Sequence, residues 1–140
     1  MIFEKKTDRE NELRLMQRFL INFHPKTFEA VKLPQFELDF MLTNESNVVA
    51  FVEIKNYNKT FEDCDSILIS MKNKYPKLLN YNSFKPTYFL VGFSCGKIAY
   101  AKVDDLNGEI RLGGRKPREG SSNDIEEIMF VDKKIFKVID

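Results

Sequence analysis

The chain has 140 residues, of which 43% are hydrophobic and 31% charged, and its formal net charge is +1. This length suits one domain with a sizeable core, so we expect a single domain over residues 1–140. No apolar run approaches the roughly 20 residues of a membrane span. The amino-terminal MIFEKKTDRE lacks a signal-peptide core, and the two cysteines, Cys64 and Cys95, form no disulfide or metal-ligand framework. We therefore expect a cytoplasmic protein.

The amino-terminal third predicts a helix followed by three strands. Residues from 7 or 8 to about 21 have apolar side chains at spacings of three and four, and Glu12 falls on that apolar face. A short strand is expected over residues 28–33. The segment QFELDFMLTNESNVVAFVEIKNY, residues 35–57, predicts two more strands joined by a polar loop near residues 45–47. Three consecutive strands would form a meander.

Three charged residues interrupt the two apolar strands of this segment: Asp39, Glu53 and Lys55. A buried charge costs several kcal/mol unless it is paired or binds a metal. Antiparallel pairing about the loop would place Asp39 opposite Glu53 or its near neighbour, with Cβ atoms ~4.5–5.5 Å apart. Two carboxylates would then be close enough to bind one ion. The alternative is an exposed Glu53–Lys55 ion pair with Asp39 as a strand-end cap.

The second half of the chain predicts a helix, a hairpin and a last strand. A helix over residues 61–78, kinked or restarted at Pro76, is indicated by apolar residues in steps of three and four: Phe61, Cys64, Leu68, Met71, Tyr75 and Leu78. PTYFLVGFS (residues 86–94) predicts a strand that turns into IAYAKV. The polar GGRKPREGSSND predicts a loop, and IMFV (residues 128–131) predicts an edge strand.

The spacing of Asp39, thirteen residues, and Glu53-Ile54-Lys55, after a helix that carries Glu12, resembles the PD-(D/E)XK nuclease superfamily. The likeness covers roughly residues 8–95, although Leu38 stands where the motif usually has proline. KLP, VEIK and the late GGR also resemble small phage or prophage nucleases. The resemblance implies an α/β, restriction endonuclease-like core of helix, three-stranded meander, helix and strand. A hairpin and an edge strand would extend it into a larger mixed sheet.

The same resemblance implies a metal-dependent nuclease that hydrolyses phosphodiester bonds in DNA. It favours an endonuclease over an exonuclease. Asp39, Glu53 and the backbone carbonyl of Ile54 would hold Mg²⁺, for which Mn²⁺ can substitute; Mg²⁺ prefers oxygen ligands and keeps several waters. Lys55 would orient the attacking water. Glu12 would hold a second ion or a water of the first, or would simply complement the helix dipole.

Basic residues indicate where DNA would bind. No acidic residue lies between Asp65 and Asp104, whereas this window holds Lys72, Lys74, Lys77, Lys85, Lys97 and Lys102. The resemblance places Lys74, and less clearly Lys72, near the substrate backbone. Arg115 and Arg118 lie in the glycine-rich segment, where arginine can pair with phosphate bidentately. The alternatives are solvated helix lysines and a plain surface loop.

The sequence also bears on other chemistries and on assembly. His24 is the only histidine, so sites built on several histidines, or on cysteines with histidine, cannot be assembled, and no P-loop is present. A catalytically inactive, nuclease-like module that binds DNA or protein, such as a phage accessory or assembly protein, is the main alternative. RNA cleavage ranks lower. An edge strand at IMFV would suit pairing of two copies, so a homodimer is one option for assembly.

Overall fold

The computed structural model describes residues 6–22, 28–34, 37–114 and 125–139. Within these residues six strands form one sheet, ordered β1-β2-β3-β5-β6-β9, and three form another, ordered β4-β8-β7. The elements in chain order are α1 (Lys6–Asn22), β1 (Glu29–Lys32), β2 (Phe40–Asn44), β3 (Asn47–Asn56), β4 (Ser66–Ser70), α2 (Tyr75–Asn82), β5 (Thr87–Gly92), β6 (Ile98–Lys102), β7 (Gly108–Gly114), β8 (Ile125–Asp132) and β9 (Lys137–Ile139).

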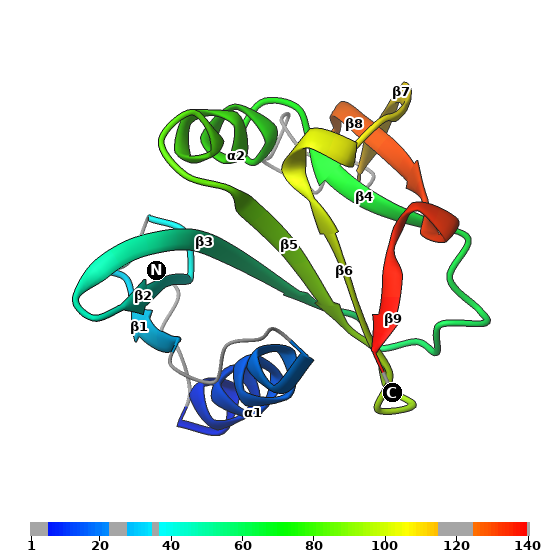
Figure 1. The fold of residues 1–140 in the computed structure, drawn as a ribbon. Helices are drawn as coiled ribbons and strands as arrows, with labels where there is room; N and C mark the ends of the chain where they lie inside the picture. The colour runs from blue at the N-terminus through cyan, green and yellow to red at the C-terminus, as the bar shows by residue number, and fades with distance from the viewer. Residues whose placement is uncertain (1–5, 23–27, 35–36, 115–124, 140) are drawn as a thin grey trace.

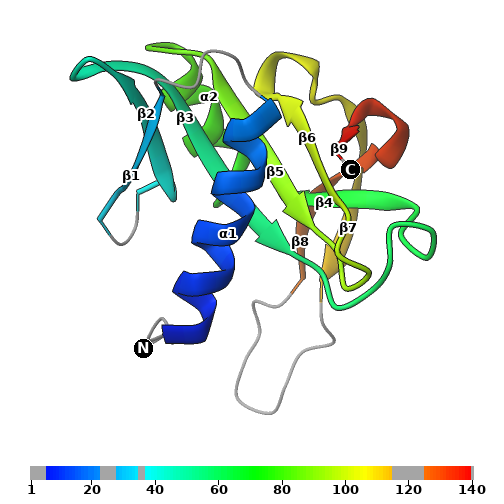
Figure 2. The same cartoon turned by 60° about the horizontal axis from the view of Figure 1, so that its bottom comes forward.

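Helix α1 covers one face of the six-stranded sheet, and it crosses in front of that sheet in Figure 2. Its apolar stripe is buried, with Met16 and Phe19 at 1% and 0% exposure. These side chains pack on even-numbered residues of the sheet, including Val52 and Leu90. Glu12 lies one turn before this stripe with its side chain 17% exposed, as the spacing predicted. The helix therefore holds a carboxylate at the border of the core.

The opposite face of the six-stranded sheet is covered by α2 and the three-stranded sheet, which lie away from α1 in Figure 1. Odd-numbered residues of β5, such as Phe89 and Val91, form a common cluster with Ile67 and Ile69 of β4 and Leu78 of α2. The two sheets thus share one apolar interface. The side chains of Glu53 and Lys55, being odd-numbered residues of β3, face this side.

The predicted meander is confirmed: β1, β2 and β3 pair antiparallel in sequence. Their hairpin turns through Glu45 and Ser46, whose φ angles of 52° and 69° are both positive. Two positive φ angles are what a two-residue hairpin turn needs to match the strand twist. A bulge between Leu42 and Thr43 then shifts the register. The pairing beyond the bulge determines which residues meet at the far end of the hairpin.

The strand predicted in PTYFLVGFS and its hairpin with IAYAKV are also confirmed. Strand β5 pairs parallel with β3 and antiparallel with β6. All six residues of β5 are buried, as expected for a strand covered on both faces. The mixed sheet and the order of its elements agree with the restriction endonuclease-like fold class that the sequence predicted.

The helix predicted over residues 61–78 is wrong in its boundaries. Residues 66–70 form β4 instead, and the helix α2 spans only Tyr75–Asn82. Strand β4 reads SILIS, and its alternating Ile67 and Ile69 are buried against the core, so the period of two prevails over the period of three to four. Pro76 lies in the first turn of α2, where proline is favoured, and therefore starts the helix rather than kinking it.

The carboxy-terminal region also differs from prediction. IMFV lies in β8, which is the central strand of the three-stranded sheet and not an edge, because β4 and β7 occupy its two sides. Edge-to-edge pairing of two copies through IMFV is therefore wrong. Strands β7 and β9 were not predicted. Most of the glycine-rich segment lies outside the described residues, as does His24. No helix in the described part of the chain is long and apolar enough to span a membrane.

Candidate active site

The antiparallel register places Asp39 beside Glu53. The β2–β3 ladder ends at the Phe40–Val52 pair, and the same register continued by one residue brings Asp39 beside Glu53. Asp39 precedes β2 and lies between Leu38, which belongs to one core cluster, and Phe40, which belongs to the other. Its Oδ2 accepts a hydrogen bond of 2.8 Å from the backbone N–H of Ile54. The carboxylate thus continues the β2–β3 ladder where backbone pairing ends.

Glu53 is an acid buried against the side of the sheet that carries α2. The residue is only 3% exposed. Burial raises its pKa to about 7, and the hydrogen bond and negative charge of Asp39 act in the same direction, while Lys74 partly opposes them. Two adjacent carboxylates that disfavour each other's charge attract any cation that can lie between them.

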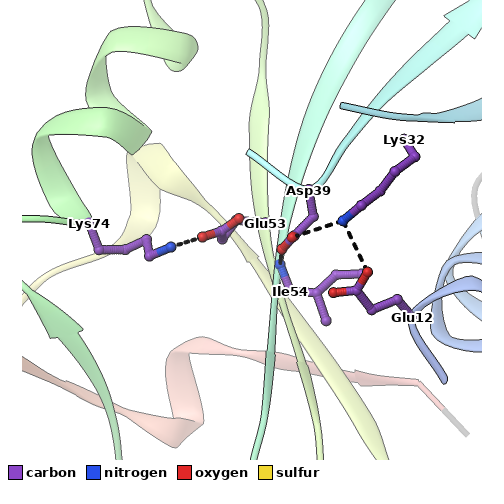
Figure 3. Close-up of polar contacts among 6 residues, drawn as sticks. All are labelled: Glu12, Lys32, Asp39, Glu53, Ile54 and Lys74. Carbon is purple, nitrogen blue, oxygen red and sulfur yellow. Dashed lines mark hydrogen bonds and ion pairs between the residues drawn. The ribbon is translucent and has the colours of Figure 1, made fainter. Parts of the chain in front are cut away.

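Two lysines approach these carboxylates from opposite sides, as Figure 3 shows. Lys74, from the turn before α2, donates to Oε2 of Glu53. Lys32, the last residue of β1, donates to Oδ1 of Asp39 at 3.3 Å and to Oε1 of Glu12 at 3.1 Å. Lys32 therefore connects Glu12 to Asp39. We call Asp39, Glu53, Lys32 and Lys74 the carboxylate centre.

Lys55 belongs to a different set of contacts. Its Nζ donates to the backbone carbonyl of Leu68 in β4 at 2.7 Å, and the N–H of Leu68 donates to the Tyr57 hydroxyl at 3.0 Å. The ammonium lies 4.9 Å from the centre of the Tyr57 ring. Burial lowers the pKa of Lys55, and the nearby charges of Lys74 and Lys59 lower it further. We call Lys55, Tyr57 and Leu68 the β4 junction.

The direction of the Ile54 backbone bears on whether its carbonyl can be a ligand. In a strand, the N–H and C=O of one residue point to the same side. Along the β3–β5 pairing, the N–H of Phe51 donates to the Pro86 carbonyl, and the N–H of Tyr57, one residue beyond β3, donates to the Gly92 carbonyl. The even-numbered Ile54 points the other way, toward Asp39, which accepts its N–H. Its carbonyl therefore points within the sheet toward β2, the side from which the Asp39 carboxylate reaches β3.

Comparison with known proteins identifies the family. A family model described as "Phage putative PDDEXK endonuclease" matches residues 1–139. The chain belongs to this family. No curated protein matches it. Among solved structures it is similar to Hjc, a Holliday junction resolvase from the archaeal hyperthermophile Archaeoglobus fulgidus. The two are 12% identical over 89% of this chain and 86% of that one, with a TM-score of 0.51, which establishes a shared fold.

Enzymes of the PD-(D/E)XK type generally use divalent metals, and the donors of the carboxylate centre suit such an ion. No group of three or more His, Cys, Asp or Glu side chains in the described ranges is arranged to hold a metal. The atoms available to such an ion are instead the carboxylate oxygens of Asp39 and Glu53 and the carbonyl oxygen of Ile54. Mg²⁺ is usually held by one or two carboxylates together with waters and substrate phosphate. The donor set therefore fits a hard, partly hydrated cation.

The structure gathers some of the predicted residues and separates others. Asp39 and Glu53 are neighbours, and Lys74 contacts Glu53. Glu12 is joined to Asp39 through Lys32. The ammonium of Lys55, in contrast, is directed to β4. Lys72 is exposed in the turn after β4. Arg115 and Arg118 lie outside the described residues.

Sequence reasoning missed Lys32 and Tyr57. The β1–β2 register, with Lys32 opposite Phe40, is the signal that would place Lys32 beside Asp39. No sequence signal pointed to Tyr57, because its partner strand β4 had been predicted as helix.

Proposed function

We propose that this chain is a divalent-metal-dependent nuclease that hydrolyses phosphodiester bonds in DNA, with Mg²⁺ as its ion and Mn²⁺ as a substitute. The observation that carries the proposal is the meeting of Asp39 and Glu53 at the end of the β2–β3 hairpin. Membership of a PDDEXK endonuclease family supports it. The likeness to a Holliday junction resolvase favours DNA over RNA by analogy of fold.

Each residue of the site would have a separate role in the reaction. Asp39, Glu53 and the Ile54 carbonyl hold the ion, which supplies Lewis acidity and neutralises charge on the phosphate. Lys55 orients the attacking water; its lowered pKa makes proton exchange near neutral pH easier than for an exposed lysine. Glu12 acts on the site through Lys32, which it shares with Asp39. Cleavage within strands is favoured over cleavage from ends because the family is one of endonucleases.

Cleavage of single-stranded, duplex and four-way DNA in EDTA, Mg²⁺ and Mn²⁺ tests this proposal. The wild-type chain should cut only with a divalent ion. Asp39→Asn and Glu53→Gln should each reduce cleavage about a thousandfold, because the ion provides several kcal/mol of transition-state stabilisation. Glu37→Gln is the matched control, since Glu37 is an exposed acid two residues from Asp39. Undiminished metal-dependent cutting by the Asp39 and Glu53 variants would refute the assignment.

A second candidate is a nuclease-like module that binds DNA or protein without cutting. The observation in its favour is that both carboxylates already have lysine partners within the chain, Lys32 and Lys74, so the acids are stabilised without an ion. Calorimetry distinguishes the two functions. DNA binding that weakens with salt, together with no heat of Mg²⁺ or Mn²⁺ binding, would favour the module.

A further inference from the structure

Lys74 makes a contact that brings it into the carboxylate centre from outside the motif strands. Its backbone is anchored on both sides, because its N–H donates to the Ser70 carbonyl and its own carbonyl accepts from the N–H of Leu78. Its side chain is 37% exposed, whereas that of Glu53 is 4% exposed. The lysine side chain therefore leads from the surface to a buried acid, with its ammonium at Oε2 of Glu53.

An ion bound by Asp39 and Glu53 would need the same carboxylate that Lys74 holds. Figure 3 shows Lys74 reaching Glu53 from the side opposite to Lys32 and Asp39. A divalent cation at Glu53 repels an ammonium within a few ångströms. The two cations therefore compete, and the flexible four-carbon stem of lysine allows the ammonium to move while the anchored backbone keeps it near the site.

We propose that Lys74 exchanges partners: it holds Glu53 until a divalent ion binds, and then binds a phosphate oxygen of the DNA beside the ion. This inference rests on the proposed function and adds to it a coupling between metal binding and DNA binding. Metal binding releases a positive charge at the position where the substrate's negative charge arrives. Metal and DNA should consequently bind with positive cooperativity, and Lys74 should carry much of that cooperativity.

Lys74 is better placed for this exchange than the other two lysines. Lys55 donates to the Leu68 carbonyl in the β4 junction rather than to a carboxylate. Lys32 is shared between Asp39 and Glu12, so loss of one carboxylate leaves it the other. Lys74 donates to Glu53, the acid whose pairing with Asp39 defines the candidate metal site.

The first measurement is the affinity for Mn²⁺ without DNA, by calorimetry on the full chain. It is made at about pH 8.5, above the pKa of Glu53, so that protons do not compete. Lys74→Met should bind Mn²⁺ about fivefold more tightly than wild type, because the competing ammonium is gone. Lys72→Met removes the same charge from the same turn, and should change the affinity less than twofold.

The second measurement is the affinity for a fluorescent DNA duplex, by anisotropy, in EDTA and in Ca²⁺, which also prefers oxygen ligands. A gel run afterwards verifies that the duplex is intact. Wild type should bind DNA about tenfold more tightly in Ca²⁺ than in EDTA, whereas Lys74→Met should gain no more than about threefold. The variant should thus bind the ion better and the DNA worse.

The outcomes separate the two proposals. Equal Mn²⁺ affinity in Lys74→Met, Lys72→Met and wild type, or an undiminished Ca²⁺ effect on DNA binding in Lys74→Met, would overturn the partner exchange and leave the proposed function intact. Failure of the wild-type chain to bind any divalent ion would overturn both.

Discussion

Glu53 and Lys55 lie two positions apart on the same face of β3, yet they belong to different regions of the molecule. Glu53 meets Asp39 and Lys74 in the carboxylate centre. Lys55 donates to the backbone of another sheet in the β4 junction. The two residues of one motif therefore have different neighbours. Glu53 adjoins another carboxylate, whereas Lys55 contacts a backbone carbonyl and an aromatic ring.

The spacing of a motif therefore does not make its residues one chemical unit. The β4 junction joins the two sheets through both polar groups of one residue, since Tyr57 accepts from the Leu68 N–H and Lys55 donates to the Leu68 carbonyl. Lys55 has a structural partner whether or not it acts on a phosphate. Its contributions to activity and to stability must be measured separately.

The largest expected effect is on cleavage by Lys55→Met. If Lys55 orients the attacking water, the variant should lose about a thousandfold in cleavage rate, and its free energy of unfolding should fall by about 1–2 kcal/mol because the Leu68 carbonyl loses a charged donor. Single-turnover cleavage and urea denaturation measure the two quantities. A stability loss without a loss of rate would assign Lys55 to the β4 junction alone.

A smaller effect concerns the stability of the carboxylate centre in EDTA. The pKa of Glu53 is about 7 in the folded chain and near 4.5 in the unfolded one. The folded state therefore binds more protons between these values, and wild type should lose stability relative to Glu53→Gln by about 3 kcal/mol as pH rises from about 4.5 to about 7. Denaturation at several pH values measures this, with Glu37→Gln correcting for general charge effects. Parallel curves for wild type and Glu53→Gln would contradict it.

The smallest effect tests the β4 junction without touching a charge. Tyr57→Phe removes the acceptor of the Leu68 N–H but keeps the ring that stacks on Phe93 at 6.0 Å. It should lower the free energy of unfolding by about 1 kcal/mol and leave metal affinity unchanged. Lys59→Met, on the same ring but exposed, should stay within about 0.5 kcal/mol of wild type. A change in metal affinity in Tyr57→Phe would show that the two regions are coupled.

The sequence predicted the part of the fold in which periodicity is unambiguous. The helix around Met16 and Phe19, the meander and the β5–β6 hairpin each have one dominant period, and each is present. The prediction of a helix around Leu68 was wrong because the apolar residues there fit both the helical spacing and the alternation of a strand. Burial of Ile67 and Ile69 by a second sheet, which no local pattern reveals, decided between them.

The candidate site was predictable where it depends on strand register and not where it depends on tertiary contacts. The two-residue turn alone would place Asp39 opposite Val52, and the bulge between Leu42 and Thr43, which the sequence did not predict, moves it one position to Glu53. The sequence therefore predicted this meeting to within one residue. The placement of Lys74 on Glu53 depends on the turn between β4 and α2, and that turn was concealed by the wrong helix prediction. Whether these residues catalyse cleavage, and whether the chain forms one domain or dimerises, stay predictions.

The two-residue turn at Glu45 and Ser46 has a consequence for how this chain can change. The side chains at the open end of the hairpin are matched by counting residues back from the turn, through the bulge at Leu42 and Thr43. An odd insertion or deletion would move one carboxylate to the wrong face of the sheet while leaving every letter of the motif in place. A change in the length of this hairpin should therefore be tolerated less well than a change in its amino-acid composition.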